Sequence, residues 1–243
     1  MALPDYNEET ILIAAAKLPP AEAIAFFRAK GFKITWDWRE TLADANNATF
    51  QVAKSMNMGV LQDVRKMVDK AIADGLTFKQ FAAELEPNLV KRGWWGSQIV
   101  DGKRVQLGSL HRLNTIYQTN TQSAYNAGRW ETQIRDKKRR PFLRLNEILD
   151  ASSRKSHAEM NGAIQRITSR FWQIQYPPRG FNCRARAQAL TEKQARALGI
   201  TKKANHRPDK GFSNNPGIKV FQAKKSDFDD DLFAEGKKMD PLF

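Results

Sequence analysis

The 243-residue sequence contains few of the residues that form covalent or metal cross-links. It has one cysteine, Cys183, and three histidines, His111, His157 and His206. A single cysteine cannot form an internal disulfide, and three histidines would need carboxylates to complete a four-ligand zinc site. These shortages exclude disulfide scaffolds and zinc fingers, and we expect no bound metal and no cofactor.

Long hydrophobic runs are also missing. The longest aliphatic run, residues 11–16, is far shorter than the roughly 18 residues that a membrane helix needs. Asp5, Glu8 and Glu9 place negative charge where a signal peptide would be basic. We therefore expect a soluble intracellular product that does not interact with a membrane.

The sequence lacks the common enzyme signatures. It contains no phosphate loop, no dinucleotide-binding glycine pattern, no H-E-x-x-H and no G-x-S-x-G. Cys183 and His157 could form a thiol–imidazole pair, but a lone cysteine is more often a small buried apolar residue. The sequence favours a protein that is not an enzyme. The alternative is an enzyme that acts on a nucleotide or nucleic acid through His157, Cys183 and Arg184.

What the sequence does contain is enough apolar material for a core and a large basic surplus. Apolar residues make up 41% of the chain, which predicts a folded protein. The 40 lysines and arginines exceed the 26 aspartates and glutamates, and the formal net charge is +14. Residues 1–100 are balanced, whereas residues 101–190 hold 17 basic and 6 acidic side chains. This surplus indicates a polyanionic partner or an acidic protein surface.

Apolar periodicity predicts helices over the first hundred residues. Two prolines precede residues 21–30 and a glycine follows them, which is the usual punctuation of a short helix. Apolar residues recur at helical spacing through residues 40–74, where we expect Gly59 to divide the pattern into two helices.

The next signals are a helix start and a loop. Thr77 and Gln80 have the spacing of a capping box, and Pro87 should end the helix that they begin. Glycines that flank Trp94 and Trp95 predict a loop over residues 93–108. We expect the N-terminal hundred residues to be all helical.

The second half of the chain predicts one long helix and a small sheet. Apolar residues at three- and four-residue steps predict a helix over residues 110–135. Residues 142–148 and 184–189 have strand patterns, and Thr191 with Gln194 opens a helix that ends at Gly199. Turn-forming residues dominate residues 201–217.

These patterns together predict a mainly helical α+β protein. We expect a helical region over residues 1–108. A long helix and a small β-sheet should follow over residues 109–200. Residues 201–243 should form a loop-rich, partly extended tail.

The richest set of polar residues lies between positions 150 and 184. Across a sheet these residues could form one charged cluster: Asp150, Arg154, His157, Glu159, Arg179, Asn182 and Arg184. In the ordinary interpretation, which we favour, Arg154 pairs with Asp150 and His157 donates to a backbone carbonyl.

Four consecutive cations, Lys137–Arg140, are a stronger signal because such charges repel one another unless water or an anion surrounds them. Six phosphate contacts would lower log K with log salt at a slope of roughly −5, without base preference. Recognition helices and zinc fingers are missing, so we expect contact with nucleic-acid phosphates that does not depend on base sequence. The candidate DNA contacts are Lys137, Lys138, Arg139, Arg140, Arg144, Arg154, Lys155, Arg179 and Arg186.

Two tryptophan pairs, Trp36 with Trp38 and Trp94 with Trp95, have two interpretations. They could anchor another subunit, since aromatic rings often dominate interface energies. We favour a place in the helical core, because a helical region of this length has few other large groups to fill it.

Three stretches resemble one family, the phage Mu F-like minor head or head-morphogenesis proteins. The first runs from PPAEAIAFFRAKG at residues 19–31 to GWWG at residues 93–96. The second is RLNTIYQTNTQSAYNAGRW at residues 112–130. The third combines residues 157–162 with YPPRGFNCR at residues 176–184. Ala185 stands where the family commonly has a second cysteine.

The resemblance implies a virion component of few copies that acts in head morphogenesis. It implies a late protein in the capsid interior near the portal, with the portal, other head proteins and packaged DNA as partners and the host cytoplasm as the place of assembly. A spacer between capsid and portal without DNA contact is an alternative. The residues that match the family pattern, expected in one structural polar cluster, are Arg112, Asn120, Arg129, His157, Asn182, Cys183 and Arg184.

Overall fold

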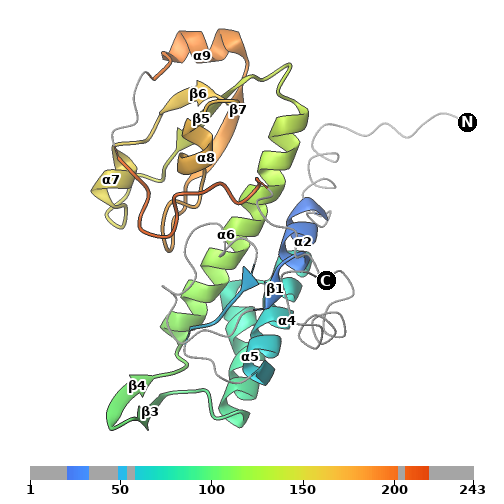
Figure 1. Cartoon of the computed structure of the whole chain (residues 1–243), viewed down its shortest axis with the longest axis vertical. Coiled ribbons are helices and arrows are strands. Elements are labelled where there is room, and N and C mark those ends of the chain that lie inside the picture. The colour runs from blue at the N-terminus through green and yellow to red at the C-terminus, as the bar shows by residue number, and fades with distance from the viewer. Residues whose placement is uncertain (1–20, 33–48, 54–57, 202–205, 219–243) are drawn as a thin grey trace, which may run out of the picture.

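The computed structural model describes residues 21–32, 49–53, 58–201 and 206–218. The long helix α6 (Leu110–Arg135) runs diagonally through the molecule (Figure 1). On one side of it lie α2 (Ala21–Arg28), α4 (Met58–Asp74) and α5 (Phe78–Lys91). A small sheet with short helices lies on the other side. The fold is α+β and mainly helical, as the sequence predicts.

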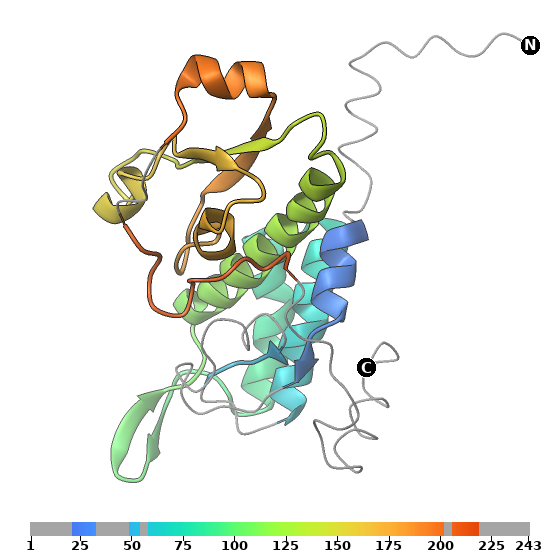
Figure 2. The same ribbon diagram turned by 45° about the horizontal axis from the view of Figure 1, so that its top comes forward.

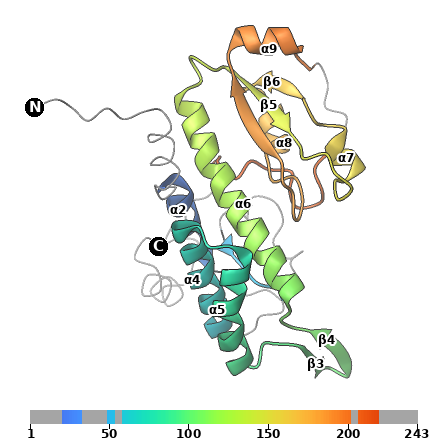
Figure 3. The ribbon, with the colours of Figure 1, turned by 180° about the vertical axis from the view of Figure 1, so that it is seen from behind.

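The N-terminal helices and the first part of α6 enclose one hydrophobic core. Figure 3 shows α4 and α5 side by side next to α6. Phe27 of α2, Leu61 and Ile72 of α4 and Leu85 of α5 are almost fully buried there. Gly128 of α6 lets α2 approach closely, since an added Cβ would lie 3.0 Å from the backbone nitrogen of Ala23. The core thus joins α6 to the helices before it.

Helix starts are where the sequence is most informative. In the capping box before α5, the Thr77 side chain accepts from the Gln80 amide and the Gln80 side chain accepts from the Thr77 amide. Thr191 and Gln194 do the same for α9 (Glu192–Leu198), which ends at Gly199 with φ 85°. The predicted helix over residues 110–135 is also confirmed.

The predicted end of the helix at Pro87 is wrong. Helix α5 continues through Pro87 to Lys91. Pro87 and Ala83, four residues earlier, are both exposed, so water can satisfy the carbonyl that proline leaves without a donor. The next turn carries Leu89, which is completely buried in the core. Burial of Leu89 therefore favours continuation of the helix.

The all-helical expectation for the first hundred residues is also wrong. Strands β1 (Gly31–Phe32) and β2 (Thr49–Phe50) form a short parallel pair within the predicted helical region. Gly59 does not divide two helices, because it is the second residue of α4. Between β2 and α4, residues 51–53 are not helical.

A hairpin replaces part of the loop predicted over residues 93–108. Strands β3 (Ser97–Val100) and β4 (Lys103–Gln106) pair in antiparallel register. Their two-residue connection, Asp101-Gly102, has φ values of 50° and 72°, which suit the left-handed turns of tight hairpins. This hairpin projects from the end of the molecule that carries the start of α6 (Figure 1).

The sheet beyond α6 has the strand order β6-β5-β7 and is antiparallel. Its strands are β5 (Phe142–Asn146), β6 (Ile164–Arg166) and β7 (Arg186–Leu190). Leu143, Leu145 and Ala187 are buried in a second core with Trp130 of α6 and Trp172 of α8 (Phe171–Gln175). The sheet therefore packs on the last turns of α6, as Figure 2 shows.

We call the opposite face of the sheet the outer face. Along each strand, residues of the outer face alternate with the residues buried in the second core. At one end α9 covers the outer face, where Ala195 packs with Phe142 and Leu190. Arg144 and Gln188 are paired in the register, as are Asn146 and Arg186. Asn146 Nδ2 donates to Gln188 Oε1, which confirms that these side chains share one face. The outer face is thus polar where α9 does not cover it.

Residues 206–218 are irregular, as their turn-forming composition predicts, and they pack on the second core. Asn215 donates to the carbonyl of Trp172, and Gln175 donates to that of His206. Phe212 stacks edge-to-face on Phe181 at 4.9 Å. This segment therefore belongs to the packed part of the chain.

The two tryptophan pairs have different outcomes. Trp94 is 4% exposed and Trp95 packs against the first core, so the core interpretation is confirmed for this pair. Trp36 and Trp38 lie outside the described residues, as does the charged segment after residue 218. No helix among the described residues is long and apolar enough to span a membrane.

Candidate functional site

A small polar pocket lies at one edge of the sheet, beside α7 (Lys155–Ala158). It has a volume of about 20 Å³, which is room for a water molecule or a small ion. Three chain segments form it: the end of β5, the loop into α7, and the turn before β7. Its lining residues are Glu147, Ile148, Ser152, Ser153, Arg154, His157, Asn182, Cys183 and Arg184.

Beneath the pocket, Arg179 and Glu147 form a buried ion pair. Arg179 Nη1 lies 3.1 Å from Glu147 Oε1, and the two side chains are 0% and 5% exposed. Arg179 Nε also donates to Gln175 Oε1 at 3.1 Å. Burial raises the pKa of Glu147, while the Arg179 charge opposes that rise. Because Arg179 is fully buried, its candidacy as a DNA contact is wrong.

The predicted ion pair between Arg154 and Asp150 is wrong, because each residue has another partner. Asp150 forms a two-bond pair with Arg184, at 2.6 and 2.7 Å, and this pair lowers the pKa of Asp150 to about 2. Arg154 lies instead 3.4 Å from Asp209 and donates to the carbonyl of Phe181. The loop is thus tied to the turn before β7 by arginines, but not by an i,i+4 pair.

The side chain of His157 is buried, and its Nε2 has no hydrogen-bond partner among the described residues. The residue is 3% exposed, and Nε2 lies 3.6 Å from Asp209 Oδ1, beyond hydrogen-bond distance. The expected donation to a backbone carbonyl does not occur among the described residues. Burial and then the charges of Arg179 and Arg154 lower the pKa of His157, which favours neutral imidazole.

Cys183 is buried, as predicted for a lone cysteine, and it lies close to His157. One ligand atom each from Glu147, His157 and Cys183 lie within 4.8 Å of one another. Burial raises the pKa of the Cys183 thiol, so the thiol is neutral near pH 7. A neutral thiol beside a neutral imidazole is not the ion pair that activates a cysteine nucleophile.

The structure does not bring all seven family-pattern residues together. His157, Asn182, Cys183 and Arg184 line the pocket. Arg112 lies near the other end of α6, where its guanidinium stacks 4.9 Å from the Trp94 ring. It also donates to the carbonyls of Ala53, Gln106 and Leu107. Arg112 therefore ties together the chain around the first core.

The other two family-pattern residues lie along α6. Asn120 donates to the carbonyl of Ile116 in the same helix, and exposed Arg129 donates to Asn126 at 2.7 Å. Arg112 and Arg129 are 17 residues apart in the helix, about 25 Å along its axis. A single cluster cannot span this distance, so these residues occupy separate places.

The candidate cations divide into paired and unpaired groups. Lys155 lies 4.0 Å from Glu159, and both Arg139 and Arg140 face Asp136. Lys137 and Lys138 are exposed in the same turn and form no ion pair among the described residues. The charge of this turn is therefore only partly balanced.

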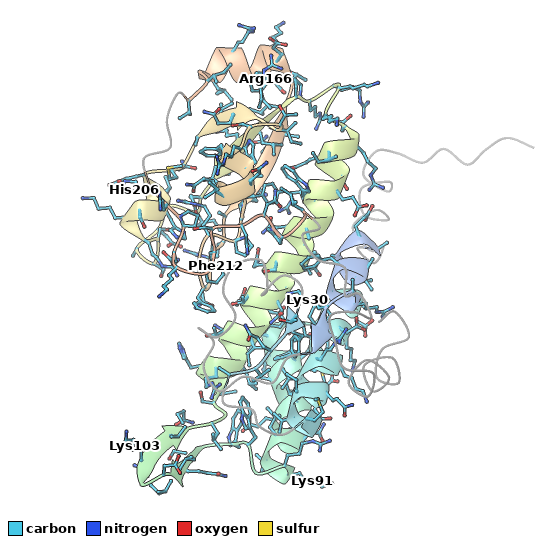
Figure 4. The ribbon with its side chains drawn as sticks, viewed as in Figure 1. Lys30, Lys91, Lys103, Arg166, His206 and Phe212 are labelled. Atoms are coloured by element: carbon cyan, nitrogen blue, oxygen red, sulfur yellow. The ribbon has the colours of Figure 1, made fainter. Side chains whose placement is uncertain are left out.

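Three arginines that form no ion pair among the described residues lie on the outer face of the sheet and its rim. Arg144 of β5 and Arg186 of β7 lie on the outer face, and Arg166 of β6 is in register with Phe142. Arg166 stacks 4.9 Å from the Phe142 ring, and Figure 4 places it at the end of the molecule that carries α9. None of the three forms an ion pair among the described residues. We call Arg144, Arg166 and Arg186 the arginine face.

Two acidic residues of the site do not stand out in the sequence. Glu147 lies within an apolar strand pattern, and Asp209 lies in a turn-rich segment far along the chain. A Cβ at Gly180 would collide with the Asp209 carboxylate, so only glycine permits this approach. Because the contact joins residues that are distant in sequence, no local spacing reveals it.

Comparison with known proteins agrees with the resemblance seen in the sequence. A family model described as "Phage Mu protein F like protein" matches residues 62–188, just over half of the chain. The match begins in α4 and ends in β7, so it includes α6 and every residue that lines the pocket. No solved structure matches.

Two curated relatives have similar sequences. The chain is 42% identical over 199 residues to "Putative capsid assembly protein F" of Escherichia phage Mu, covering 79% of this chain and 45% of that protein. It is 38% identical over 168 residues to "Mu-like prophage FluMu F protein" of Haemophilus influenzae, covering 69% and 41% respectively. The chain thus spans less than half the length of these relatives.

Proposed function

The chain belongs to the Phage Mu protein F like family, and on this premise we propose that it is a non-enzymatic minor head protein that acts in phage head assembly. The observation that carries the proposal is the 42% identity, over most of this chain, to a protein named for capsid assembly. The residues that the family model matches include α6, part of the first core, most of the second core and all the residues that line the pocket.

Deletion of the gene from its phage tests the proposal. Electron microscopy of lysates should show few or no complete heads, and supplying the full chain from a plasmid should restore them. Normal numbers of complete, DNA-filled heads after deletion would contradict a role in head assembly.

We propose further that the protein sits in the capsid interior near the portal. The helices α2, α4 and α5 are the candidate docking elements, since the basic residues are concentrated in the other part of the chain. Co-expression with the portal protein should yield a complex that survives gel filtration. If the two proteins elute separately while the chain enters heads, the portal is not its partner.

The arginine face supports contact with DNA that does not depend on sequence. Arg144, Arg166 and Arg186 form no ion pair among the described residues, and exposed Lys137 and Lys138 belong to the same part of the molecule. Guanidinium groups bind phosphate oxygens without reading bases. Packaged double-stranded DNA supplies phosphates at high density.

Gel shifts of unrelated duplexes at rising salt test this contact. We expect binding at low salt that weakens steeply as salt increases. The variant Arg144→Gln/Arg166→Gln/Arg186→Gln should flatten the slope of log K against log salt by about 2 to 3.

The matched control is Lys79→Gln/Lys91→Gln/Lys103→Gln, which removes the same charge from exposed positions. Figure 4 shows Lys91 and Lys103 at the opposite end of the molecule from Arg166. Equal effects of the two triple variants would indicate attraction by net charge alone. No binding at low salt would support a spacer between capsid and portal.

A further inference from the structure

Three side chains of different types converge on the pocket from separate segments. Glu147 follows β5, His157 lies in α7, and Cys183 precedes β7. One oxygen, nitrogen or sulfur from each lie within 4.8 Å of one another. The exposed fractions are 5% for the Glu147 side chain, 3% for His157 and 4% for Cys183. Carboxylate, imidazole and thiolate are the three ligand types that zinc accepts.

The imidazole of His157 has a nitrogen, Nε2, that lacks a hydrogen-bond partner among the described residues. The residue is almost completely buried. A buried polar group without a partner costs free energy, commonly about 1–3 kcal/mol. The atom without a partner is Nε2, which lies 3.6 Å from Asp209 Oδ1. A cation bound to Nδ1 would place the imidazole hydrogen on Nε2, where it would face this carboxylate. Metal-binding histidines commonly have such a carboxylate behind them.

Glu147 also has one carboxylate oxygen that is available to bind an ion. Arg179 donates to Oε1, and Oε2 accepts no hydrogen bond among the described residues. Arg179 would then hold the carboxylate in place while Oε2 binds the ion. The pocket, which the same three residues line, has room for one water molecule as a further ligand.

The charges around the pocket permit a cation. Three arginines lie there, and each faces a carboxylate: Arg179 faces Glu147, Arg184 faces Asp150, and Arg154 faces Asp209. These six charges balance before any ion binds. A thiolate at Cys183 would offset half the charge of a divalent ion, so the site would gain one positive charge.

We propose that Glu147, His157 and Cys183 bind one zinc ion, with a water molecule from the pocket as the fourth ligand. The mixed oxygen, nitrogen and sulfur set suits zinc better than magnesium or calcium, which prefer oxygen ligands alone. Cys183 binds as the thiolate, and its proton passes to solvent when the ion enters. The ion would join β5, α7 and the turn before β7.

Titration of the full, chelator-treated chain with cobalt(II) tests the proposal, because cobalt(II) occupies tetrahedral zinc sites and absorbs light. We expect visible bands of a four-coordinate ion and a near-ultraviolet band of sulfur-to-cobalt charge transfer, saturating at one cobalt per chain. Zinc should displace both. The sequence contains only one cysteine, so a charge-transfer band can come only from Cys183. A chain that shows no such band overturns the proposal.

Variants locate the site. His157→Ala should abolish stoichiometric zinc binding, whereas His111→Ala, an exposed histidine of α6, should bind as the wild type does. Asp209→Asn should weaken zinc binding about 10- to 100-fold, since it removes the carboxylate charge that faces the imidazole of His157. If His157→Ala does not fold by circular dichroism, Asp209→Asn and the wild-type cobalt spectrum decide. Wild-type affinity in Asp209→Asn and in a folded His157→Ala would overturn the assignment.

Discussion

At the scale of single residues, Lys30 shows a conflict between charge and burial. It follows α2, is 5% exposed, and its ammonium lies 5.2 Å from the centre of the Phe26 ring. Burial lowers the pKa of Lys30 to about 8, and the positive charge of Arg65 contributes. Keeping Lys30 protonated at neutral pH therefore costs the folded protein free energy.

Replacing Lys30 with methionine should stabilise the protein at pH 7. The folded pKa lies below the unfolded value of 10.5, so the wild type loses stability when Lys30 is protonated and regains it as pH rises from about 8 to 10.5. The difference in free energy of unfolding between Lys30→Met and the wild type should shrink by about 2 kcal/mol from pH 7 to pH 10. Urea unfolding at several pH values measures it.

Lys79→Met is the control for the loss of a lysine as such. Lys79 lies exposed in α5, so its variant should differ from the wild type by the same small amount at both pH values. A constant advantage of Lys30→Met across this range would show that the gain comes from apolar packing and not from the buried charge.

Residues differ in how well the neighbouring sequence predicts whether they are buried. The burial of Cys183 follows from the general behaviour of a lone cysteine and is confirmed. The burial of Arg179 does not follow, since its partner Glu147 lies 32 positions away, just after β5. A charged residue is predicted to be exposed unless its partner is known. The partner becomes visible only when the chain has folded.

At the scale of elements, α5 shows that core packing can override a helix breaker. Pro87 lies inside the helix and should weaken it, because proline has no amide hydrogen and its ring crowds the carbonyl four residues earlier. The helix nevertheless continues, and Leu89 is fully buried beyond the proline. The free energy of Leu89 burial offsets part of the cost of Pro87.

The variant Pro87→Ala should therefore be more stable than the wild type. Alanine restores the amide donor and removes the steric conflict, which we expect to raise the free energy of unfolding by about 1–3 kcal/mol. Thermal and urea unfolding measure the change. Asn88→Ala, at the neighbouring exposed position, is the control and should gain only about 0.5 kcal/mol. If the free energy of unfolding rises equally in the two variants, Pro87 does not destabilise this helix more than an ordinary residue does.

Elements with local signals are predictable, and those without are not. The capping boxes at Thr77 and Thr191 lie within four residues of sequence, and both helices begin where these residues predict. The β3–β4 hairpin had a local signal too, in Asp101-Gly102, which the prediction of a loop overlooked. Strands β1 and β2 are two residues each and pair across a gap in sequence. Only their position in the folded chain explains them.

At the scale of the whole molecule, the basic surplus is predictable and its arrangement is not. Residue counts locate the surplus in residues 101–190, but the fold decides which cations are balanced. Arg154, Arg179 and Arg184 face carboxylates around the pocket, while Arg144 and Arg186 remain unpaired on the outer face of the sheet. The predicted single basic surface therefore reduces to the arginine face and the turn after α6.

The long helix α6 connects the two halves of the molecule because it contributes to both cores. Leu113 and Ala124 are buried with the N-terminal helices, whereas Trp130 is buried with the sheet. Arg112 also fixes the start of α6 to the carbonyls of Ala53, Gln106 and Leu107. The N-terminal helices thus lack part of their own core when α6 is absent.

A fragment of residues 1–108 should therefore fail to fold cooperatively, whereas residues 1–135 should fold. The shorter fragment would expose the apolar faces of α4 and α5 that Leu113 and Ala124 cover, and each buried leucine contributes about 1.5–3 kcal/mol. Circular dichroism during urea unfolding distinguishes a sigmoidal transition from a gradual one. A cooperative transition in residues 1–108, with the helical content expected for α2, α4 and α5, would show that the first core is complete without α6. The boundary between the two halves would then lie before this helix.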